Sequence, residues 1–208
     1  MKLILKQKNK ELFGANFEII ENENIVGYIS LKGKVGTMEV SLDGNLYDRY
    51  FKLNCLNEFK TGNSKKFRPY NILENENIIG QIYETEFKKN IFSKYSYDKC
   101  FYKEQEYNLY SIGLGEKAIN VLYKDNTQIA QIEKDGTIYN DLHNYDIYSI
   151  DKENTFISVL MSCYMYIITC YKPGVKITES VKKVYSKTTN KDLVSKYDPN
   201  WIKNLKEN

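Results

Sequence analysis

Apolar and polar residues alternate in short stretches along residues 1–150, and turn residues separate these stretches at short intervals. Segment 37–42, for example, places Met38, Val40 and Leu42 on one side and polar residues on the other. A period of two is typical of strands that bury one face. The stretches between turns predict about twelve strands, spaced as in a sandwich or a closed barrel. A hairpin turn is predicted at Asp43-Gly44, because Asp-Gly between alternating segments favours a tight turn.

The pattern changes at residues 155–171, a stretch of seventeen residues without a charge. Its apolar side chains cover every face of a helix, so a helix here has to be buried on all sides. We predict this helix at about 153–171. A membrane span needs about 20 apolar residues, whereas runs of about 10–14 are usually core helices. The Tyr, Ser and Thr residues of the segment favour a core helix, and a membrane anchor at 155–171 is the alternative.

Three segments of similar sequence begin 53 and 50 residues apart, at residues 17–29, 70–82 and 120–132. Each contains a strand, a turn rich in Asn and acidic residues, and a second strand. Spacings of this size are typical of repeated supersecondary units. All three copies carry a small residue at one position: Gly27, Gly80 or Ala130. Because a small residue permits close approach to a strand, we predict that the helix packs against these positions.

The strands and the helix together predict one fold. An antiparallel sheet buries one face, and closing the sheet removes its exposed edges. A barrel of about twelve strands is too wide for its own side chains to fill, so an apolar helix is a suitable plug. We therefore predict a mainly β protein: an antiparallel closed barrel of about twelve strands, threaded by the hydrophobic helix, over residues 1–171.

Residues 172–208 form a short basic extension, with nine Lys and four acidic residues, that we expect to pack on the barrel. Asp198 followed by Pro199 predicts the start of a helix. Trp201, Ile202 and Leu205 then share one apolar face, which we expect to dock on the outside of the barrel. A helix that binds a partner is the alternative, because such helices use the same spacing.

The repeated Glu-Asn turn followed by Ile-x-Gly-x-Ile, the many short strands, and residues 146–150 leading into the apolar helix resemble the tubby C-terminal-like superfamily. That superfamily includes the phospholipid scramblases and the LURP-one-related plant proteins. The resemblance implies a twelve-stranded antiparallel barrel threaded by a hydrophobic helix, over about residues 1–171. Two departures stand out. Another 37 residues follow the helix, and no positions match the phosphoinositide-binding pattern of tubby proteins, so no site residue is carried over.

Basic residues gather in two loops. Lys60, Lys65, Lys66 and Arg68 lie between the first two repeats, and Lys88, Lys89 and Lys94 lie near apolar residues further on. Basic side chains interleaved with apolar ones suit an anionic membrane surface. We predict contact with anionic, phosphoinositide-like lipid at these seven residues, with charged loops that serve solubility alone as the alternative.

Candidate catalytic chemistry is sparse. His143 is the only histidine and lies in a polar segment, where we predict a solvated turn residue. One histidine makes Ser-His-Asp, Cys-His and His-ligated metal sites hard to build. Cys55, Cys100, Cys163 and Cys170 lack metal spacing and are predicted to be reduced thiols. The Glu-Asn-Glu-Asn segments could offer oxygens to calcium, but they lack the EF-hand pattern and are predicted to be Asx-type turns. No cofactor or metal is expected.

These patterns predict a non-enzymatic cytosolic binding or scaffold protein whose contact with membranes is peripheral. Its expected partners are an anionic membrane lipid or another protein. The net charge of +3 is too small to indicate a nucleic-acid partner. Two alternatives from other classes stay open: a small hydrolase or lipid-modifying enzyme that uses carboxylates, and a membrane protein anchored by residues 155–171.

Overall fold

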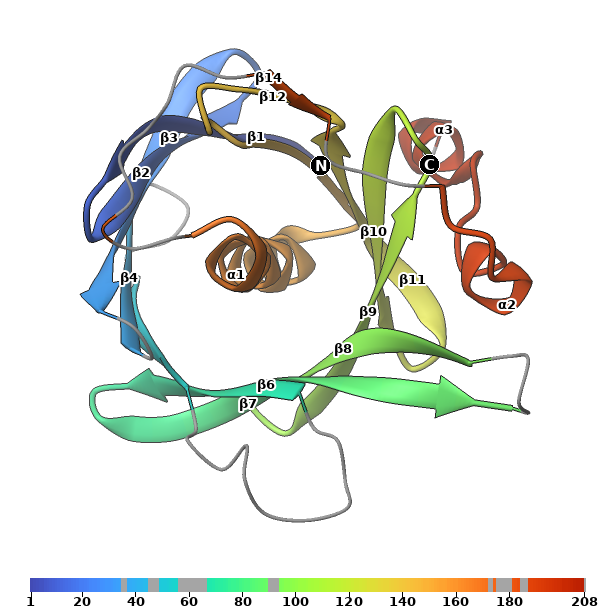
Figure 1. Cartoon of the computed structure of the whole chain (residues 1–208), viewed down its shortest axis with the longest axis horizontal. Coiled ribbons are helices and arrows are strands. Elements are labelled where there is room, and N and C mark those ends of the chain that lie inside the picture. The colour runs from blue at the N-terminus through green and yellow to red at the C-terminus, as the bar shows by residue number, and fades with distance from the viewer. Residues whose placement is uncertain are drawn as a thin grey trace.

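The computed structural model describes residues 1–34, 37–44, 49–55, 67–89, 94–171, 174, 181–183 and 187–207. In this part of the chain, twelve strands form a closed antiparallel barrel around a central helix, α1 (Lys152–Thr169), as Figure 1 shows. The predicted architecture is confirmed. The barrel strands are β1 (Lys2–Glu11), β2 (Gly14–Glu21), β3 (Asn24–Lys34), β4 (Thr37–Gly44), β5 (Arg49–Cys55), β6 (Phe67–Glu74), β7 (Asn77–Lys88), β8 (Lys94–Tyr102), β9 (Gln105–Gly113), β10 (Lys117–Lys124), β11 (Thr127–Asp135) and β13 (Asn144–Ser149).

Strands that follow one another in sequence pair with one another from β1 to β11, and β13 closes the barrel between β11 and β1. The strand between them in sequence, β12 (Thr137–Tyr139), leaves the barrel. It pairs with β14 (Val181–Lys183) of the C-terminal extension in a separate two-stranded sheet. Of the two strands that follow Gly136, only β13 therefore belongs to the barrel wall.

Helix α1 fills the lumen. Its residues are buried from Asn154 to Ile167 without interruption, as expected for a helix that is apolar on every face. Asp151 caps its N-terminus, where a carboxylate oxygen accepts a hydrogen bond from the backbone N–H of Asn154 over 2.8 Å. The buried hydroxyls of Ser158 and Ser162 donate to backbone carbonyls one turn earlier, so the helix brings few unsatisfied polar groups into the core. No helix in the described ranges combines the length and apolarity that crossing a bilayer requires.

Each sequence repeat forms a hairpin with the same two irregularities. Its turn places two consecutive residues at positive φ, for example Asn22 at 48° and Glu23 at 66°, which is the backbone of a type I′ turn. A register shift follows: Ile19 pairs with Gly27 and the next residue pairs with Ile25, so one residue bulges out. The other two repeats carry the same shift. The repeat therefore encodes a tight turn plus a β-bulge.

In two of the three repeats, the group that approaches the small residue is the neighbouring strand and not the helix. At Ala130, packing of the helix stays a prediction. A Cβ atom on Gly27 would lie 2.6 Å from the carbonyl oxygen of Asp43, and one on Gly80 would lie 2.2 Å from that of Phe101. Both oxygens belong to the neighbouring strand.

The predicted hairpin is confirmed, because β4 pairs with β5 as far as Leu42 and Arg49, but Asp43 and Gly44 do not form a two-residue turn. These residues end β4 and pair with Tyr28 and Gly27 of β3. The connection to β5 follows them at residues 45–48, outside the described residues. Pairing with β3 keeps Asp43 and Gly44 in strand β4, so the connection to β5 begins only after them.

The C-terminal extension contains two short helices, α2 (Lys191–Val194) and α3 (Trp201–Glu207). Leu193 of α2 joins an apolar cluster on the outer face of β8, β9 and β10, together with Tyr95 and Tyr110. Ahead of α2, Thr188 exchanges two hydrogen bonds with the backbone of Gly113, at 2.8 and 2.9 Å. Helix α3 begins two residues after Pro199. The docking of its apolar face on the barrel stays a prediction.

Candidate functional site

The inner face of β8 to β11 changes from apolar to polar toward one end of the barrel. Side chains two residues apart on a strand face the same side. Core residues Cys100, Leu109, Leu122 and Ile132 face the lumen. The polar residues two positions away from them face it as well. We call these four side chains the polar lumen cluster: Asp98, Ser111, Asn120 and Lys134.

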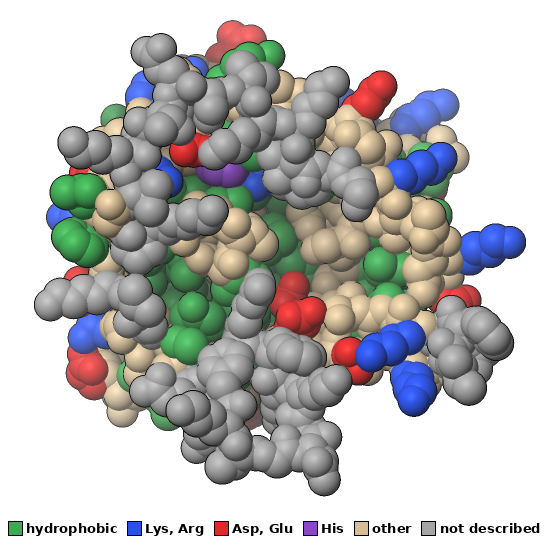
Figure 2. Space-filling model, in the orientation of Figure 1, with side chains coloured by type: hydrophobic (Ala, Val, Ile, Leu, Met, Phe, Trp, Pro, Cys, Tyr) green, Lys and Arg blue, Asp and Glu red, His purple; other side chains and the backbone are tan. Residues whose placement is uncertain are grey.

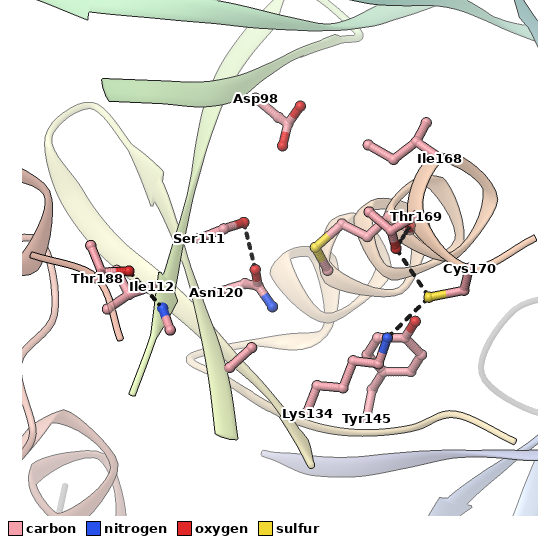
Figure 3. Close-up of a pocket in the computed structure, with 13 residues that line it drawn as sticks. Asp98, Ser111, Ile112, Asn120, Lys134, Tyr145, Ile168, Thr169, Cys170 and Thr188 are labelled. Carbon is pink, nitrogen blue, oxygen red and sulfur yellow. Dashed lines mark hydrogen bonds between the residues drawn. The ribbon is translucent and has the colours of Figure 1, made fainter. Parts of the chain in front are cut away.

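The polar lumen cluster lines a cavity of about 340 Å³ beside the C-terminal end of α1. Figure 3 shows Ile168, Thr169 and Cys170 on the helix side of the cavity, across from Ser111 and Asn120, with Lys134 reaching Cys170. Figure 2 views the barrel from this end and shows a recess among hydrophobic and acidic side chains. The volume falls within the range of about 300–1,000 Å³ that is typical of small-molecule sites.

Lys134 is the most deeply buried charged side chain of the cavity, at 5% exposure. Its Nζ atom donates a hydrogen bond to Sγ of Cys170 over 3.1 Å and lies 5.1 Å from the centre of the Tyr145 ring. Burial lowers the pKa of Lys134 because it disfavours the charged ammonium, and the contact with Cys170 opposes this effect only in part. The amine therefore gives up its proton more readily than an exposed lysine.

A carboxylate occupies another part of the cavity wall. Asp98 accepts a hydrogen bond from the Tyr164 hydroxyl of α1 over 3.3 Å. Burial raises the pKa of Tyr164 well above its usual value, and the negative charge of Asp98 raises it further. This hydroxyl therefore keeps its proton. Glu84 of β7 is the cross-strand partner of Asp98 and faces the same side of the sheet. This pair is the arrangement that the carboxylate-enzyme alternative needs, but of the two only Asp98 is among the described residues that line the cavity.

Ser111 and Asn120 lie on the wall formed by β9 and β10. The Ser111 hydroxyl donates to the side-chain oxygen of Asn120 over 2.7 Å. This bond orients the Asn120 amide, whose nitrogen faces the cavity in Figure 3. The cavity therefore presents a carboxylate, an amide and a basic amine, with the apolar Met165 and Ile168 beside them. Such a surface can hold a small molecule by charge and by hydrogen bonds.

The seven predicted lipid-contact residues are only partly placed. Lys60, Lys65 and Lys66 lie outside the described residues, and Arg68 belongs to β6 with its side chain outside the description. Lys88, Lys89 and Lys94 are exposed at the end of the β7–β8 hairpin, where Lys88 and Lys94 are cross-strand partners. Lys94 also forms an ion pair with Glu86 over 2.8 Å. The structure thus brings Lys88, Lys89 and Lys94 together at one end of this hairpin.

The prediction of a solvated His143 was wrong. The residue is buried, at 7% exposure, and its ring meets the Tyr166 ring edge-on with centres 5.6 Å apart. Its backbone N–H donates to the side chain of Gln7. The turn lies earlier, at Asn140 and Asp141, which both have positive φ. The chain has already returned to the barrel wall at position 143.

The four cysteines differ in their surroundings, which their sequence spacing did not indicate. All four are described and are thiols. Cys100 and Cys163 are fully buried, and burial raises the pKa of Cys163 to about 12. These two thiols are therefore unreactive at neutral pH. Cys170 is half-buried and lies on the cavity next to Lys134.

Sequence reasoning missed the polar lumen cluster, although the signal is present. Each of its residues shares the strand phase of an apolar core residue two positions away. A polar residue at such a position has to be buried beside a polar cavity or satisfied by a partner. Among the described residues, no set of three His, Cys, Asp or Glu side chains is arranged to hold a metal ion.

Comparisons with models of known protein families, with curated proteins and with solved structures find no match to this chain. The barrel threaded by a helix is the architecture that the tubby-like resemblance implied. Membership of that superfamily stays a prediction.

Proposed function

We propose that this chain is a binding protein whose barrel holds a small zwitterionic molecule in the cavity at the C-terminal end of α1. The observation that carries this proposal is one cavity lined by both Asp98 and Lys134. Charges in a site with little water interact more strongly than charges on a surface. A ligand with an ammonium near Asp98 and a carboxylate near Lys134 would complement both walls.

The remaining lining residues support a ligand of mixed character. Asn120 can donate to an anionic group, and Met165 and Ile168 offer an apolar surface to a short carbon skeleton. Binding of an anion would also favour the protonated form of Lys134, because a nearby opposite charge stabilises the ammonium. In this proposal the role is binding and not catalysis, and the protein is cytosolic.

Thermal unfolding in the presence of the standard amino acids tests this function. We expect at least one of them to raise the unfolding midpoint, whereas ethylamine and propionate, which carry one charge each, do not. Asp98→Asn and Lys134→Met should both abolish the shift. Lys117→Met is the matched control, because Lys117 forms an ion pair with Glu133 at the barrel surface. The proposal fails if no amino acid shifts the midpoint, or if the shift survives in both cavity variants.

A second candidate function is contact with anionic lipid through the end of the β7–β8 hairpin. Phe87 is 39% exposed there, directly before the exposed Lys88 and Lys89. An exposed aromatic ring beside basic side chains suits a headgroup surface, where each Lys contributes about 1 kcal/mol.

Co-sedimentation with vesicles tests the lipid contact. Vesicles that contain an acidic phospholipid should retain the protein at low salt, and purely phosphatidylcholine vesicles should not. Lys88→Gln combined with Lys89→Gln should weaken retention several-fold. The control is Lys103→Gln combined with Lys152→Gln. Both lysines are exposed, one in the β8–β9 turn and the other in the first turn of α1. Equal loss in both double variants would show that only net charge matters.

A further inference from the structure

Two nucleophilic side chains share the cavity wall. Nζ of Lys134, from β11, and Sγ of Cys170, directly after α1, are 3.1 Å apart. Both line the same cavity, as Figure 3 shows. The barrel wall and the central helix hold them in position, because Lys134 lies in the β10–β11–β13 ladder and the N–H of Cys170 donates to the carbonyl of Tyr166. An amine and a thiol at this separation can react with the same carbon atom.

We propose that Lys134 and Cys170 capture small aldehydes as a covalent bridge in which one carbon joins the lysine nitrogen to the cysteine sulfur. This activity goes beyond reversible binding and does not depend on the zwitterionic ligand. It requires no metal, oxidant or reductant.

The chemistry balances in three steps. The neutral amine of Lys134 attacks the carbonyl carbon, an N–C bond forms, and the oxygen takes up the proton that the nitrogen loses. The resulting carbinolamine releases water to give an imine. The Cys170 thiol then adds across the imine: sulfur bonds to carbon and the proton goes to nitrogen. One amine, one aldehyde and one thiol become one bridge and one water molecule, with no change in oxidation state.

The site favours each step. Burial lowers the pKa of Lys134, so a larger share of this amine is neutral than for an exposed lysine, and only the neutral amine attacks. The fixed 3.1 Å separation makes addition of the thiol intramolecular, which raises its effective concentration. Cys170 is half-buried, so the pair is not sealed from outside. The cavity volume restricts capture to small aldehydes.

Other groups around the amine determine how capture depends on pH. Cys170 and Tyr145 face Lys134 directly, and Asp98 lines the same cavity. Lys134 also borders a second cavity, which Lys6 and Asp135 line. With its pKa lowered, Lys134 should reach its maximal rate of capture at a lower pH than exposed lysines do.

Formaldehyde at one equivalent tests the proposal on the whole chain. The bridge adds CH₂O and loses H₂O, so the intact mass should rise by one carbon atom. Peptide mapping should place that carbon between positions 134 and 170. Lys134→Arg and Cys170→Ser should each reduce the bridged product by roughly tenfold or more. The matched controls, Lys117→Arg and Cys55→Ser, should leave it unchanged.

Two readouts keep the test decisive if a cavity variant folds poorly. Within the wild-type protein, formaldehyde should modify Lys134 faster than the exposed Lys88 and Lys103 at neutral pH. Equal rates, or a bridge that does not map to this pair, would overturn the proposal. Asp98→Asn should keep the bridge while losing amino-acid binding, so failure of capture and failure of the proposed binding function are distinguishable.

Discussion

The Tyr164 hydroxyl, in the C-terminal half of the buried helix, donates to a carboxylate oxygen of Asp98 on the barrel wall over 3.3 Å. Tyr164 is fully buried, and its ring also meets that of Tyr70 edge-on, with centres 5.7 Å apart. The contact joins the helix to the same wall that carries the cavity. A helix with apolar side chains on every face has little to fix its rotation in the lumen, and a directional hydrogen bond supplies such a constraint.

Tyr164→Phe removes the donor and leaves the ring in place. We expect the free energy of unfolding to fall by about 1–2 kcal/mol, because the carboxylate of Asp98 loses a hydrogen-bond partner. Urea unfolding measures the change. Tyr166→Phe is the comparison: Gln7 donates to the Tyr166 hydroxyl but also to the carbonyl of Asn9. A larger loss in Tyr166→Phe than in Tyr164→Phe would contradict the role of Asp98.

The small residue of each repeat gives a second prediction. In Gly80→Ala, the new methyl group would meet the carbonyl oxygen of Phe101 at 2.2 Å and Cδ1 of Ile72 at 2.9 Å. We expect a loss of about 1–3 kcal/mol, the usual cost of overpacking. Ala130 occupies the corresponding position of the third repeat, and Ala130→Gly should cost only about 0.5–1 kcal/mol through chain entropy. Equal unfolding midpoints for wild type and Gly80→Ala would rule out the close approach.

The tight turns predict a stabilising substitution. Glu23 is exposed and has a φ of 66°, a conformation that glycine adopts without a Cβ penalty. Glu23→Gly should therefore raise the free energy of unfolding by about 1 kcal/mol, since Asn-Gly is the preferred type I′ pair. Thermal and urea unfolding check this. The same change at Lys32, an exposed position inside β3, should have the opposite sign, because glycine weakens a regular strand.

The burial of Lys134 predicts that the free energy of unfolding depends on pH. Burial lowers its pKa below the 10.5 of an exposed lysine. The unfolded chain therefore binds this proton more tightly, and stability rises with pH between the folded and unfolded pKa values. Lys134→Met removes the free-energy cost of burying a protonated amine. Its urea midpoint should exceed that of wild type near pH 7, and the difference should shrink toward roughly pH 10.

The exposed Lys103 provides the control for this titration. Lys103→Met should leave the slope of stability against pH as it is in wild type. A constant difference between Lys134→Met and wild type across the whole range would mean that Lys134 titrates as an exposed lysine does. Circular dichroism at each pH confirms that the compared proteins are folded.

The fold was largely predictable because its signals are local. The period of two marks strands whatever they pair with, and the uncharged segment 155–171 has no polar face to expose. Gly27 and Gly80 were noticed for the right reason, close approach. The approaching group is a carbonyl of the neighbouring strand, which lies outside the repeat and is placed by strand pairing.

By itself, the sequence determined that hairpins follow one another along the first 150 residues and that the apolar helix has to be buried. Closure, by contrast, depends on tertiary structure. The barrel closes because β13, and not the preceding strand β12, pairs with both β11 and β1. The same holds for the cavity. Asp98, Lys134 and Cys170 line one cavity only once the strand register and the position of the helix are both set. Their contacts join positions far apart in the chain, so no local pattern specifies them.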